Sequence, residues 1–270
     1  MGKELTLASV GIDIGTTTTQ LVLSRLTLVN VMPGSQVPRI EIAHKSVTYM
    51  GTVHFTPFLD RRHVDGPTLR KLIAREYELA GIQPSDIDTG AIIITGEAAK
   101  KENAAEIIHS LADYAGDFVV ATAGPDLESL IAGKGSGAEE LSKRFRTRIA
   151  NIDIGGGTSN IALFDKGVCI GTACVNVGGR LFEVDALTHR LSYVTDPARK
   201  VADCLAKKSG QELFPAATPE AELAGINICL DWMVQSVERV LFRESLAAVD
   251  QSLVMSDSLP AEPAQAVVFS

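Results

Sequence analysis

The stretch NIDIGGGTSNIALF, residues 151–164, decides the fold that we expect for this chain. An apolar segment runs into Asp153, turns through three consecutive glycines and returns at once as a second apolar segment. Apolar runs on both sides of a Gly-rich turn are typical of a β-hairpin with a widened loop. Three glycines cost stability, because glycine loses more conformational freedom on folding than any other residue. The stretch therefore favours a functional loop over a simple turn.

The same pattern occurs earlier in the chain. IDIGTTTTQLVL, from Ile12, aligns without a gap with IDIGGGTSNIAL, from Ile152, at an offset of 153 − 13 = 140 residues. Two copies within 270 residues predict two related lobes, since single hydrophobic cores stop growing near ~250 residues. We expect the first lobe over residues 1–150, with a small peripheral β element at about 26–65, and the second lobe over 151–270.

The segments outside the two hairpins alternate between helical and strand patterns. Such alternation implies βαβ units, and therefore an α/β fold. Helices are expected over residues 68–81, 97–116, 125–135, 197–208 and 220–248. Further strands are expected over residues 90–96, 117–123, 168–177 and 265–270.

Asp13 and Asp153 occupy matched positions at the ends of the two expected hairpin strands. A single Asp there can merely cap its own turn through an Asx hydrogen bond, but two matched copies favour a shared role. Facing carboxylates can hold the water shell of Mg²⁺, which prefers octahedral oxygen coordination and keeps several waters beside substrate phosphates. We therefore predict that both carboxylates bind Mg²⁺ through water.

The two turns combine glycines with hydroxyl side chains. Glycines let the backbone approach a phosphate closely, and consecutive N–H groups form an anion-binding nest. The candidate glycines are Gly15, Gly155, Gly156 and Gly157. The candidate hydroxyl donors are Thr16, Thr17, Thr18, Thr19, Thr158 and Ser159. A merely flexible hairpin tip would leave the match between the two copies unexplained, so we predict phosphate binding at both.

Composition excludes several other classes of protein. The net charge of −8 disfavours nucleic acids and anionic membranes as partners, because both select basic surfaces. No run approaches the ~18 apolar residues of a membrane span, and the first residues lack the apolar region of a signal peptide. The four cysteines form no Cys-x-x-Cys pair, and the five histidines lack metal-ligand spacing. We expect a soluble protein of the reducing cytosol, and assign the histidines no role.

The two hairpins resemble the phosphate motifs of the actin-like ATPase superfamily. GIDIGTTTTQLVL is similar to the first motif and NIDIGGGTSNIALF to the second. The resemblance implies a two-lobed, ribonuclease H-like α/β fold with duplicated mixed sheets, whose lobes close on ATP and Mg²⁺. VNVGGRLFEVD matches the turn that follows the second motif in the chaperone branch, which implies that Gly178 and Gly179 approach the nucleotide.

The connecting segments resemble a narrower family, the reactivating factors of adenosylcobalamin enzymes, and most specifically that of ethanolamine ammonia-lyase. The similar segments are GIDIGTTTTQLVLSRL, IIITGEAAKKENA, VVATAGPDLESLIAGKGSG and NIDIGGGTSNIALFDKG. The resemblance covers essentially the whole chain. It implies a cytoplasmic, slow ATPase that releases damaged cobalamin from the lyase so that adenosylcobalamin can rebind, and it is compatible with association with a bacterial microcompartment.

Two departures limit what the resemblance implies. Gly124 stands where the chaperones place an acidic residue before proline, so hydrolysis should be slow unless Asp126, Glu128 or Asp153 substitutes. The superfamily's adenosine motif, a Gly-Gly pair after a late strand, is expected to follow residues 266–270, where the sequence ends. We therefore expect an incomplete second lobe and a longer natural protein.

Two other functions stay open at this point. A small-molecule kinase would use an Asp base to deprotonate a substrate hydroxyl. The chaperone-like DIGGGTSN loop and the lack of an evident Asp-bearing substrate motif between the copies count against it. A scaffold that binds nucleotide without turnover remains compatible with Gly124.

Overall fold

The computed structural model describes residues 4–32, 39–60, 62–95, 98, 101–114, 116–122, 124–214 and 218–270. The chain divides into two compact units, Met1–Ala123 and Gly124–Ser270. The division falls before the expected boundary at residue 150, because helices α3 (Pro125–Gly135) and α4 (Ala138–Phe145) pack on the second sheet. These helices therefore belong to the second unit.

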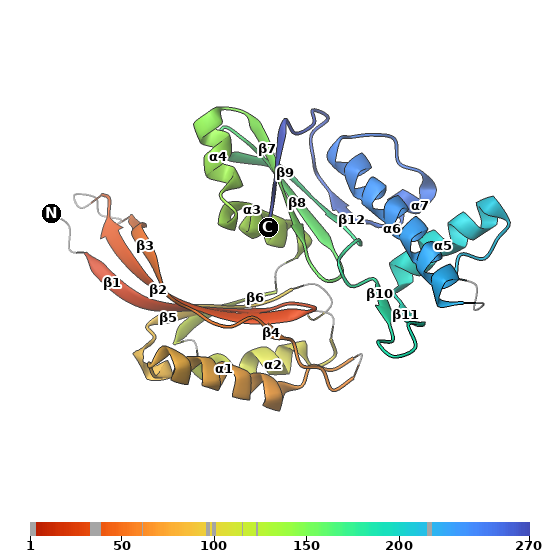
Figure 1. Ribbon diagram of the computed structural model, residues 1–270. Coiled ribbons are helices and arrows are strands. Elements are labelled where there is room, and N and C mark those ends of the chain that lie inside the picture. The colour runs from red at the N-terminus through yellow and green to blue at the C-terminus, as the bar shows by residue number, and fades with distance from the viewer. Residues whose placement is uncertain are drawn as a thin grey trace. The chain divides into compact units, whose positions relative to one another are not determined.

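The first unit is built on one mixed sheet with the strand order β3-β2-β1-β5-β6, in which β4 also pairs with β2 (Figure 1). Strands β1, β2 and β3 are antiparallel, whereas β5 and β6 run parallel to β1. The strands are β1 (Leu5–Ile14), β2 (Thr18–Asn30), β3 (Ile40–Met50), β4 (His54–Phe55), β5 (Thr89–Ile94) and β6 (Asp117–Thr122).

The residues expected to form a peripheral β element at about 26–65 are not set apart in this way. Strand β2 continues to Asn30 and pairs with β3 along its length, from Val22 opposite Met50 to Asn30 opposite Ile40. This pairing satisfies backbone groups that a detached hairpin would leave to solvent. The described part of this segment is therefore an extension of the main sheet, while residues 33–38 and 61 lie outside the description.

Helices α1 (Gly66–Ala80) and α2 (Ala104–Ser110) cover one face of the first sheet (Figure 1). Two short 3₁₀ turns, Pro84–Asp86 and Ala112–Tyr114, follow them. Apolar side chains of α1 and α2 pack with those of β1, β2 and β5 in one core. The described helix α2 is much shorter than the expected 97–116, because Asn103 bonds both backbone polar groups of Val64 and the helix begins after it.

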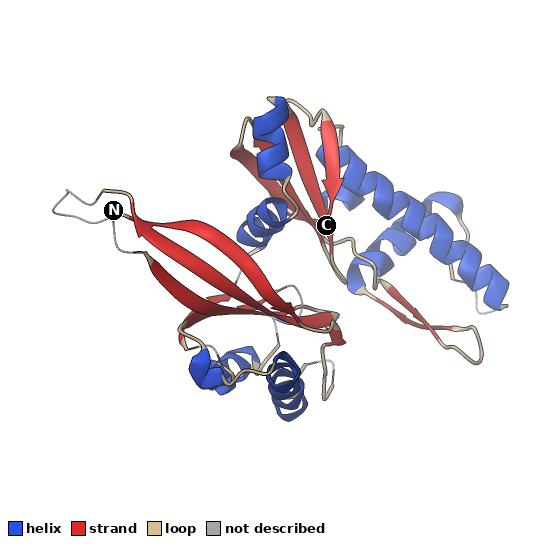
Figure 2. Ribbon diagram, turned by 60° about the vertical axis from the view of Figure 1, so that its left-hand side comes forward, coloured by secondary structure: helices blue, strands red, loops and turns tan. Residues whose placement is uncertain are grey.

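The second unit contains a mixed sheet with the order β12-β9-β8-β7-β13 and a separate two-stranded sheet, β10-β11. Helices α3 and α4 lie on one face of the five-stranded sheet, and α5, α6 and α7 on the other (Figures 1 and 2). The strands are β7 (Arg148–Ile154), β8 (Ser159–Asp165), β9 (Val168–Val175), β10 (Phe182–Val184), β11 (Leu191–Val194), β12 (Val254–Asp257) and β13 (Ala266–Phe269). The remaining helices are α5 (Asp196–Ser209), α6 (Pro219–Leu241) and α7 (Ala248–Gln251).

The single long helix expected over 220–248 is two helices. Helix α6 ends at Leu241, and Arg243 then adopts a φ of 58° that no continuing helix permits. The chain returns to α7, whose buried Asp250 accepts hydrogen bonds from Trp232 Nε1 at 3.0 Å and Ser236 Oγ at 2.6 Å. A buried carboxylate bonded in this way fixes the corner between the two helices.

The strand pairing confirms the internal repeat. Ile14 lies opposite Thr19 in the first hairpin, and Ile154 lies opposite Ser159 in the second, again 140 residues on. Each hairpin also pairs in parallel on its other side, β1 with β5 and β7 with β13. The two units therefore place the same hairpin at the same position in a mixed sheet.

Candidate nucleotide-binding hairpins

The second hairpin turns between β7 and β8 and is closed by a hydrogen bond from the Gly155 N–H to the Thr158 carbonyl at 2.9 Å. The following Gly-Gly turn lies against it: Gly179 N–H donates to the Gly155 carbonyl at 2.9 Å, and Arg180 N–H donates to the Gly156 carbonyl at 2.7 Å. The predicted Gly-Gly turn therefore backs the second hairpin directly.

Only glycine fits at the first position of this backing turn. A Cβ on Gly178 would lie 2.6 Å from the carbonyl carbon of Gly156, which is backbone and has no rotamer to escape into. A Cβ on Gly179 would meet nothing closer than the Gly155 oxygen at 3.9 Å. The two neighbouring glycines therefore differ in what they require.

The backing turn also orients the N–H groups of the second hairpin. In a planar trans peptide the C=O and the following N–H point in opposite directions, and the described residues contain no cis bond. Because the carbonyls of Gly155 and Gly156 point to the backing turn, the N–H groups of Gly156 and Gly157 point away from it. Neither N–H makes a hydrogen bond within the described part of the chain. This arrangement fits an anion such as a phosphate.

The first hairpin turns between β1 and β2 and closes in the same way, with Gly15 N–H donating to the Thr18 carbonyl at 2.8 Å. Its backing comes from a different segment. Thr56, just after β4, donates its N–H to the Thr17 carbonyl at 2.9 Å and its hydroxyl to the Gly15 carbonyl at 2.8 Å. A single residue thus takes the part that the Gly-Gly turn plays in the second unit.

The two aspartates lie where the sequence predicted, each on the last turn of its inner hairpin strand. Asp13, opposite Gln20, is exposed, whereas Asp153, opposite Asn160, is half-buried. Burial raises the pKa of Asp153, an effect partly offset by the Ser270 hydroxyl, which donates to its Oδ1 at 3.3 Å. Both side chains offer the carboxylate oxygens that Mg²⁺ takes, directly or through water.

The hydroxyl residues divide into two groups. Thr19 and Ser159 are both only 1% exposed. Ser159 donates to the Val177 carbonyl at 2.7 Å, and Thr19 is bonded to Thr56 Oγ1 at 2.9 Å, so both stabilise their hairpins from within. The Thr17 hydroxyl is buried and has no hydrogen-bond partner among the described residues, which fits a ligand oxygen. Thr16, Thr18 and Thr158 lie in the turns themselves.

Asn160 is a candidate that sequence reasoning missed. It is 1% exposed, and neither its side-chain oxygen nor its nitrogen has a partner within the described residues. Its register places it directly opposite Asp153. The repeat could have found it, because Gln20 stands at the matching position of the first hairpin, where its Nε2 donates to the Gly51 carbonyl at 2.9 Å.

The start of α3 bears on which residue activates water. Gly124 is the N-cap of α3 and provides no side-chain bond there. Asp126 Oδ1 accepts hydrogen bonds from Thr172 and Ser256, both at 2.9 Å, and so ties α3 to β9 and β12. This structural role disfavours Asp126 among the three acids considered, and leaves Glu128 and Asp153.

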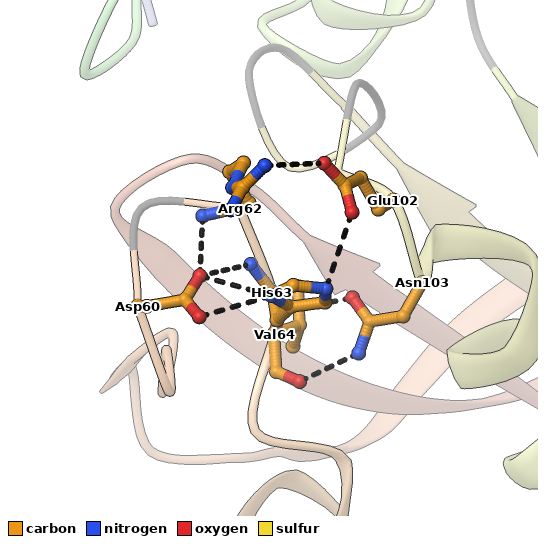
Figure 3. Close-up of polar contacts among 6 residues, drawn as sticks. All are labelled: Asp60, Arg62, His63, Val64, Glu102 and Asn103. Carbon is orange, nitrogen blue, oxygen red and sulfur yellow. Dashed lines mark hydrogen bonds and ion pairs between the residues drawn. The ribbon is translucent and has the colours of Figure 1, made fainter.

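A charged cluster joins two connections of the first unit (Figure 3). His63 Nδ1 lies 3.0 Å from Asp60 Oδ2, and His63 Nε2 lies 3.4 Å from Glu102 Oε2 (Figure 3). Arg62 pairs with the other oxygen of Glu102 at 3.3 Å. Within the described ranges no group of three His, Cys, Asp or Glu side chains could hold a metal ion. The cluster therefore acts as an exposed brace between the connections.

Two mixed sheets that each present a strand, an Asp and a Gly-containing turn at the same register define a protein of the actin-like ATPase fold, a fold associated with nucleotide binding. The chain belongs to the family described as ethanolamine utilisation protein EutA, which it matches over residues 5–270. The expected fold class and the narrower family resemblance are thereby confirmed.

Two curated relatives bear the name ethanolamine ammonia-lyase reactivase EutA. The protein of Salmonella typhimurium strain LT2 is 46% identical over 258 residues, which are 95% of this chain and 53% of that protein. The protein of Escherichia coli strain K12 is 45% identical over 261 residues, which are 94% of this chain and 53% of that protein. The chain thus spans about half the length of the curated relatives it matches.

A solved structure, the PilM–PilN type IV pilus biogenesis complex, contains a chain similar to this one with a TM-score of 0.50. The match has 11% sequence identity and covers 86% of this chain and 76% of that chain, so it bears on the fold alone. None of the helices in the described residues is long and apolar enough to cross a membrane.

Proposed function

We propose that this chain provides the phosphate-binding hairpins of an ethanolamine ammonia-lyase reactivase. The reactivase uses ATP and Mg²⁺ to release damaged cobalamin from the lyase, so that adenosylcobalamin can rebind, and it works in the cytoplasm beside that enzyme. The observation that carries the proposal is the pair of matched hairpins in a chain of the EutA family, each with its carbonyls bonded to a backing segment and an Asp at the strand end.

The residues of the two hairpins divide the work. The N–H groups of Gly156 and Gly157 donate to phosphate oxygens, and the turn from Gly15 does the same in the first unit. Asp13 and Asp153 hold Mg²⁺ through its waters. Bound Mg²⁺ neutralises phosphate charge and orients the nucleotide. Hydrolysis removes the γ-phosphate, and with it the contacts that hold the two turns to a common ligand.

Coupling to the lyase follows from linkage. A chaperone can loosen a bound cofactor only by binding the cofactor-free or opened enzyme more tightly than the blocked enzyme. The nucleotide must change that preference, and by reciprocity the lyase must change the affinity for nucleotide. Slow turnover suits such a cycle, and Gly124 at the start of α3, in place of an acid, supports it.

The test uses the protein at the full length of its curated relatives. Lyase blocked by an inactive cobalamin is incubated with this protein, free adenosylcobalamin, ATP and Mg²⁺, and the return of lyase activity is followed. We expect reactivation only with both ATP and Mg²⁺. Asp153→Asn should bind the lyase without reactivating it, whereas Gly179→Ala, which meets no close neighbour, should behave as the natural protein.

Two other results would replace the proposal. Reactivation that persists without ATP would show a scaffold that works by binding alone. ATP consumption that keeps pace with a newly phosphorylated small molecule, and that is indifferent to the lyase, would show a kinase instead. Measuring phosphate release, product phosphorylation and lyase activity on one sample separates these outcomes.

A further inference from the structure

The segment that leads from β3 through β4 toward α1 is held by a buried carboxylate. Glu76 of α1 is 1% exposed, and its Oε2 accepts hydrogen bonds from the Tyr49 hydroxyl at 2.7 Å and the Thr52 N–H at 3.1 Å. His54 Nε2 lies 2.7 Å from the other carboxylate oxygen, Oε1. Three groups from residues 49–54 thus converge on a single helix side chain.

The same segment contacts the first hairpin on its other side. His54 pairs with Thr19 across β4 and β2, and the Gly51 N–H donates to the Leu21 carbonyl at 2.8 Å. Thr56, which is 6% exposed, ends this run of contacts at the turn itself. The turn of the first hairpin is therefore connected through Thr56 to an anchored segment and not to mobile solvent.

The direction of each hydrogen bond at Thr56 follows from counting protons. A carbonyl only accepts, so the Thr56 hydroxyl donates its one proton to the Gly15 oxygen at 2.8 Å. The 2.9 Å contact between the Thr56 and Thr19 hydroxyls must then have Thr19 as the donor. Thr19 therefore has no proton left for a phosphate, and its role is to support Thr56.

Thr56 fixes the direction of two peptide groups in the turn. Its hydroxyl holds the Gly15 carbonyl and its N–H holds the Thr17 carbonyl. Because a trans peptide points its N–H opposite to its C=O, the N–H groups of Thr16 and Thr18 point to the side away from Thr56. The Gly-Gly turn holds the carbonyls of Gly155 and Gly156 in the second unit with the same consequence.

We infer that Thr56, a residue outside the Gly-rich motif, is a positioning residue for the phosphate-binding turn of the first hairpin: its hydroxyl holds the Gly15 carbonyl so that the turn presents its N–H groups to a phosphate. This inference rests on the proposed function. Thr56 touches the turn and not the ligand, so its loss should change how well the turn is organised before any nucleotide arrives.

The central variant is Thr56→Val, which keeps the shape of the side chain and removes its hydroxyl. In the full-length protein we expect the affinity for ATP with Mg²⁺, measured by calorimetry, to fall about tenfold. Thr56→Ser keeps the hydroxyl and should bind within about twofold of the natural protein. Thr19→Val leaves the bond from Thr56 to Gly15 in place and should also stay within about twofold.

Two controls separate positioning from a general loss of stability. Tyr77→Phe removes a buried hydroxyl that bonds the Tyr114 carbonyl in the same unit, far along α1 from β4. His63→Ala breaks the exposed brace at the far end of the same connection (Figure 3). Both should leave the affinity for ATP unchanged, even where they lower the unfolding free energy as much as Thr56→Val does.

Amide hydrogen exchange without nucleotide makes the test independent of the proposed function. Thr56→Val should speed exchange in a peptide spanning residues 12–20 by about tenfold, and Thr56→Ser should not. Unchanged exchange in Thr56→Val would overturn the inference, whatever binds. A natural protein that binds no ATP would overturn the proposed function, while the exchange result would still decide the role of Thr56. If the valine variant does not fold, a tenfold loss of affinity in Thr56→Ser would overturn the inference.

Discussion

The two hairpins share a turn but differ in what supports it. In the second hairpin the backing consists of backbone N–H groups from a Gly-Gly turn only 22 residues further along, counted from Gly156 to Gly178. In the first it consists of Thr56, 41 residues from Gly15, through both its hydroxyl and its N–H. Sequence repetition preserved the turn, and each unit solved the positioning of its carbonyls separately.

The difference shows what a Gly-rich turn needs besides glycine. Glycines permit the close approach of a phosphate, but they also leave the peptide groups free to rotate. A second segment must therefore hold the carbonyls before the N–H groups can face one ligand. Removing that segment should affect binding in each unit through a different atom, which gives the comparison its tests.

The largest effect is expected from the aspartates at the strand ends. Asp13→Asn or Asp153→Asn in the full-length protein should lower Mg²⁺-dependent ATP turnover by at least about 100-fold, because each removes a charge that orients the metal. The fold should survive in both variants. Near-normal turnover with unchanged metal dependence in either variant would show that the hairpins do not form one site.

The pKa of Asp153 sharpens this prediction. Burial raises that pKa above the usual 3.8, so the ionised carboxylate is less favourable in the folded protein than in the unfolded chain. Stability is therefore lost as the pH rises from about 3.8 through the folded pKa. Asp153→Asn should not lower the unfolding free energy at pH 7, as denaturant titration would show.

The next largest effect is expected at the backing turn of the second hairpin. Gly178→Ala forces a Cβ to within 2.6 Å of the Gly156 backbone and should lower the unfolding free energy by about 1–3 kcal/mol. Nucleotide affinity should fall with it. Gly179→Ala is the matched control, and its effect should stay within about 0.5 kcal/mol. Equal effects of the two variants in denaturant titrations would contradict the packing argument.

A smaller effect distinguishes the first unit, whose backing depends on Glu76. Burial alone would raise the pKa of Glu76, but hydrogen bonds from His54, Tyr49 and Thr52 outweigh it and lower the pKa below the usual 4.5. The stability that this carboxylate contributes is present above pH 4.5 and is lost as the pH falls through the lowered pKa.

Glu76→Gln should therefore destabilise the protein by about 1–2 kcal/mol at pH 7, by weakening bonds to a buried acceptor. The loss should be smaller near pH 4, where the natural protein has already lost part of this contribution. Thermal unfolding across this pH range measures both. A penalty that is the same at all pH values would mean that the charge of Glu76 is not what holds the segment.

The smallest effect is expected from two side chains with buried polar atoms that lack partners among the described residues, one in each unit. Thr17→Val and Asn160→Leu replace unpaired polar atoms by apolar groups of similar shape, so each should be neutral or stabilise the protein by up to about 1 kcal/mol. Each should nevertheless weaken nucleotide binding. Clear destabilisation with unchanged affinity, seen by calorimetry, would show that these groups serve the fold instead.

The sequence by itself determined the two hairpins, their offset and the aspartates at the strand ends, because apolar periodicity, the Gly-rich turns and their repetition are local signals. It also predicted α1 and α3 closely, since Gly81 and Pro125 mark a helix end and a helix start. It did not predict the end of α6 at Leu241, because residues 242–248 carry no strong helix-breaking signal and the corner depends on Asp250.

Tertiary structure alone decided which residues hold the turns. Thr56 and Glu76 lie far from Gly15 in sequence, and nothing in their neighbours marks them; only the pairing of β4 with β2 brings Thr56 to the turn. The same reason removed Thr19 and Ser159 from the group of ligand donors, because a hydroxyl proton is available to phosphate only if the fold has not already used it. Motif spacing specifies which groups a loop carries, whereas the contacts behind the loop specify which of them face a ligand.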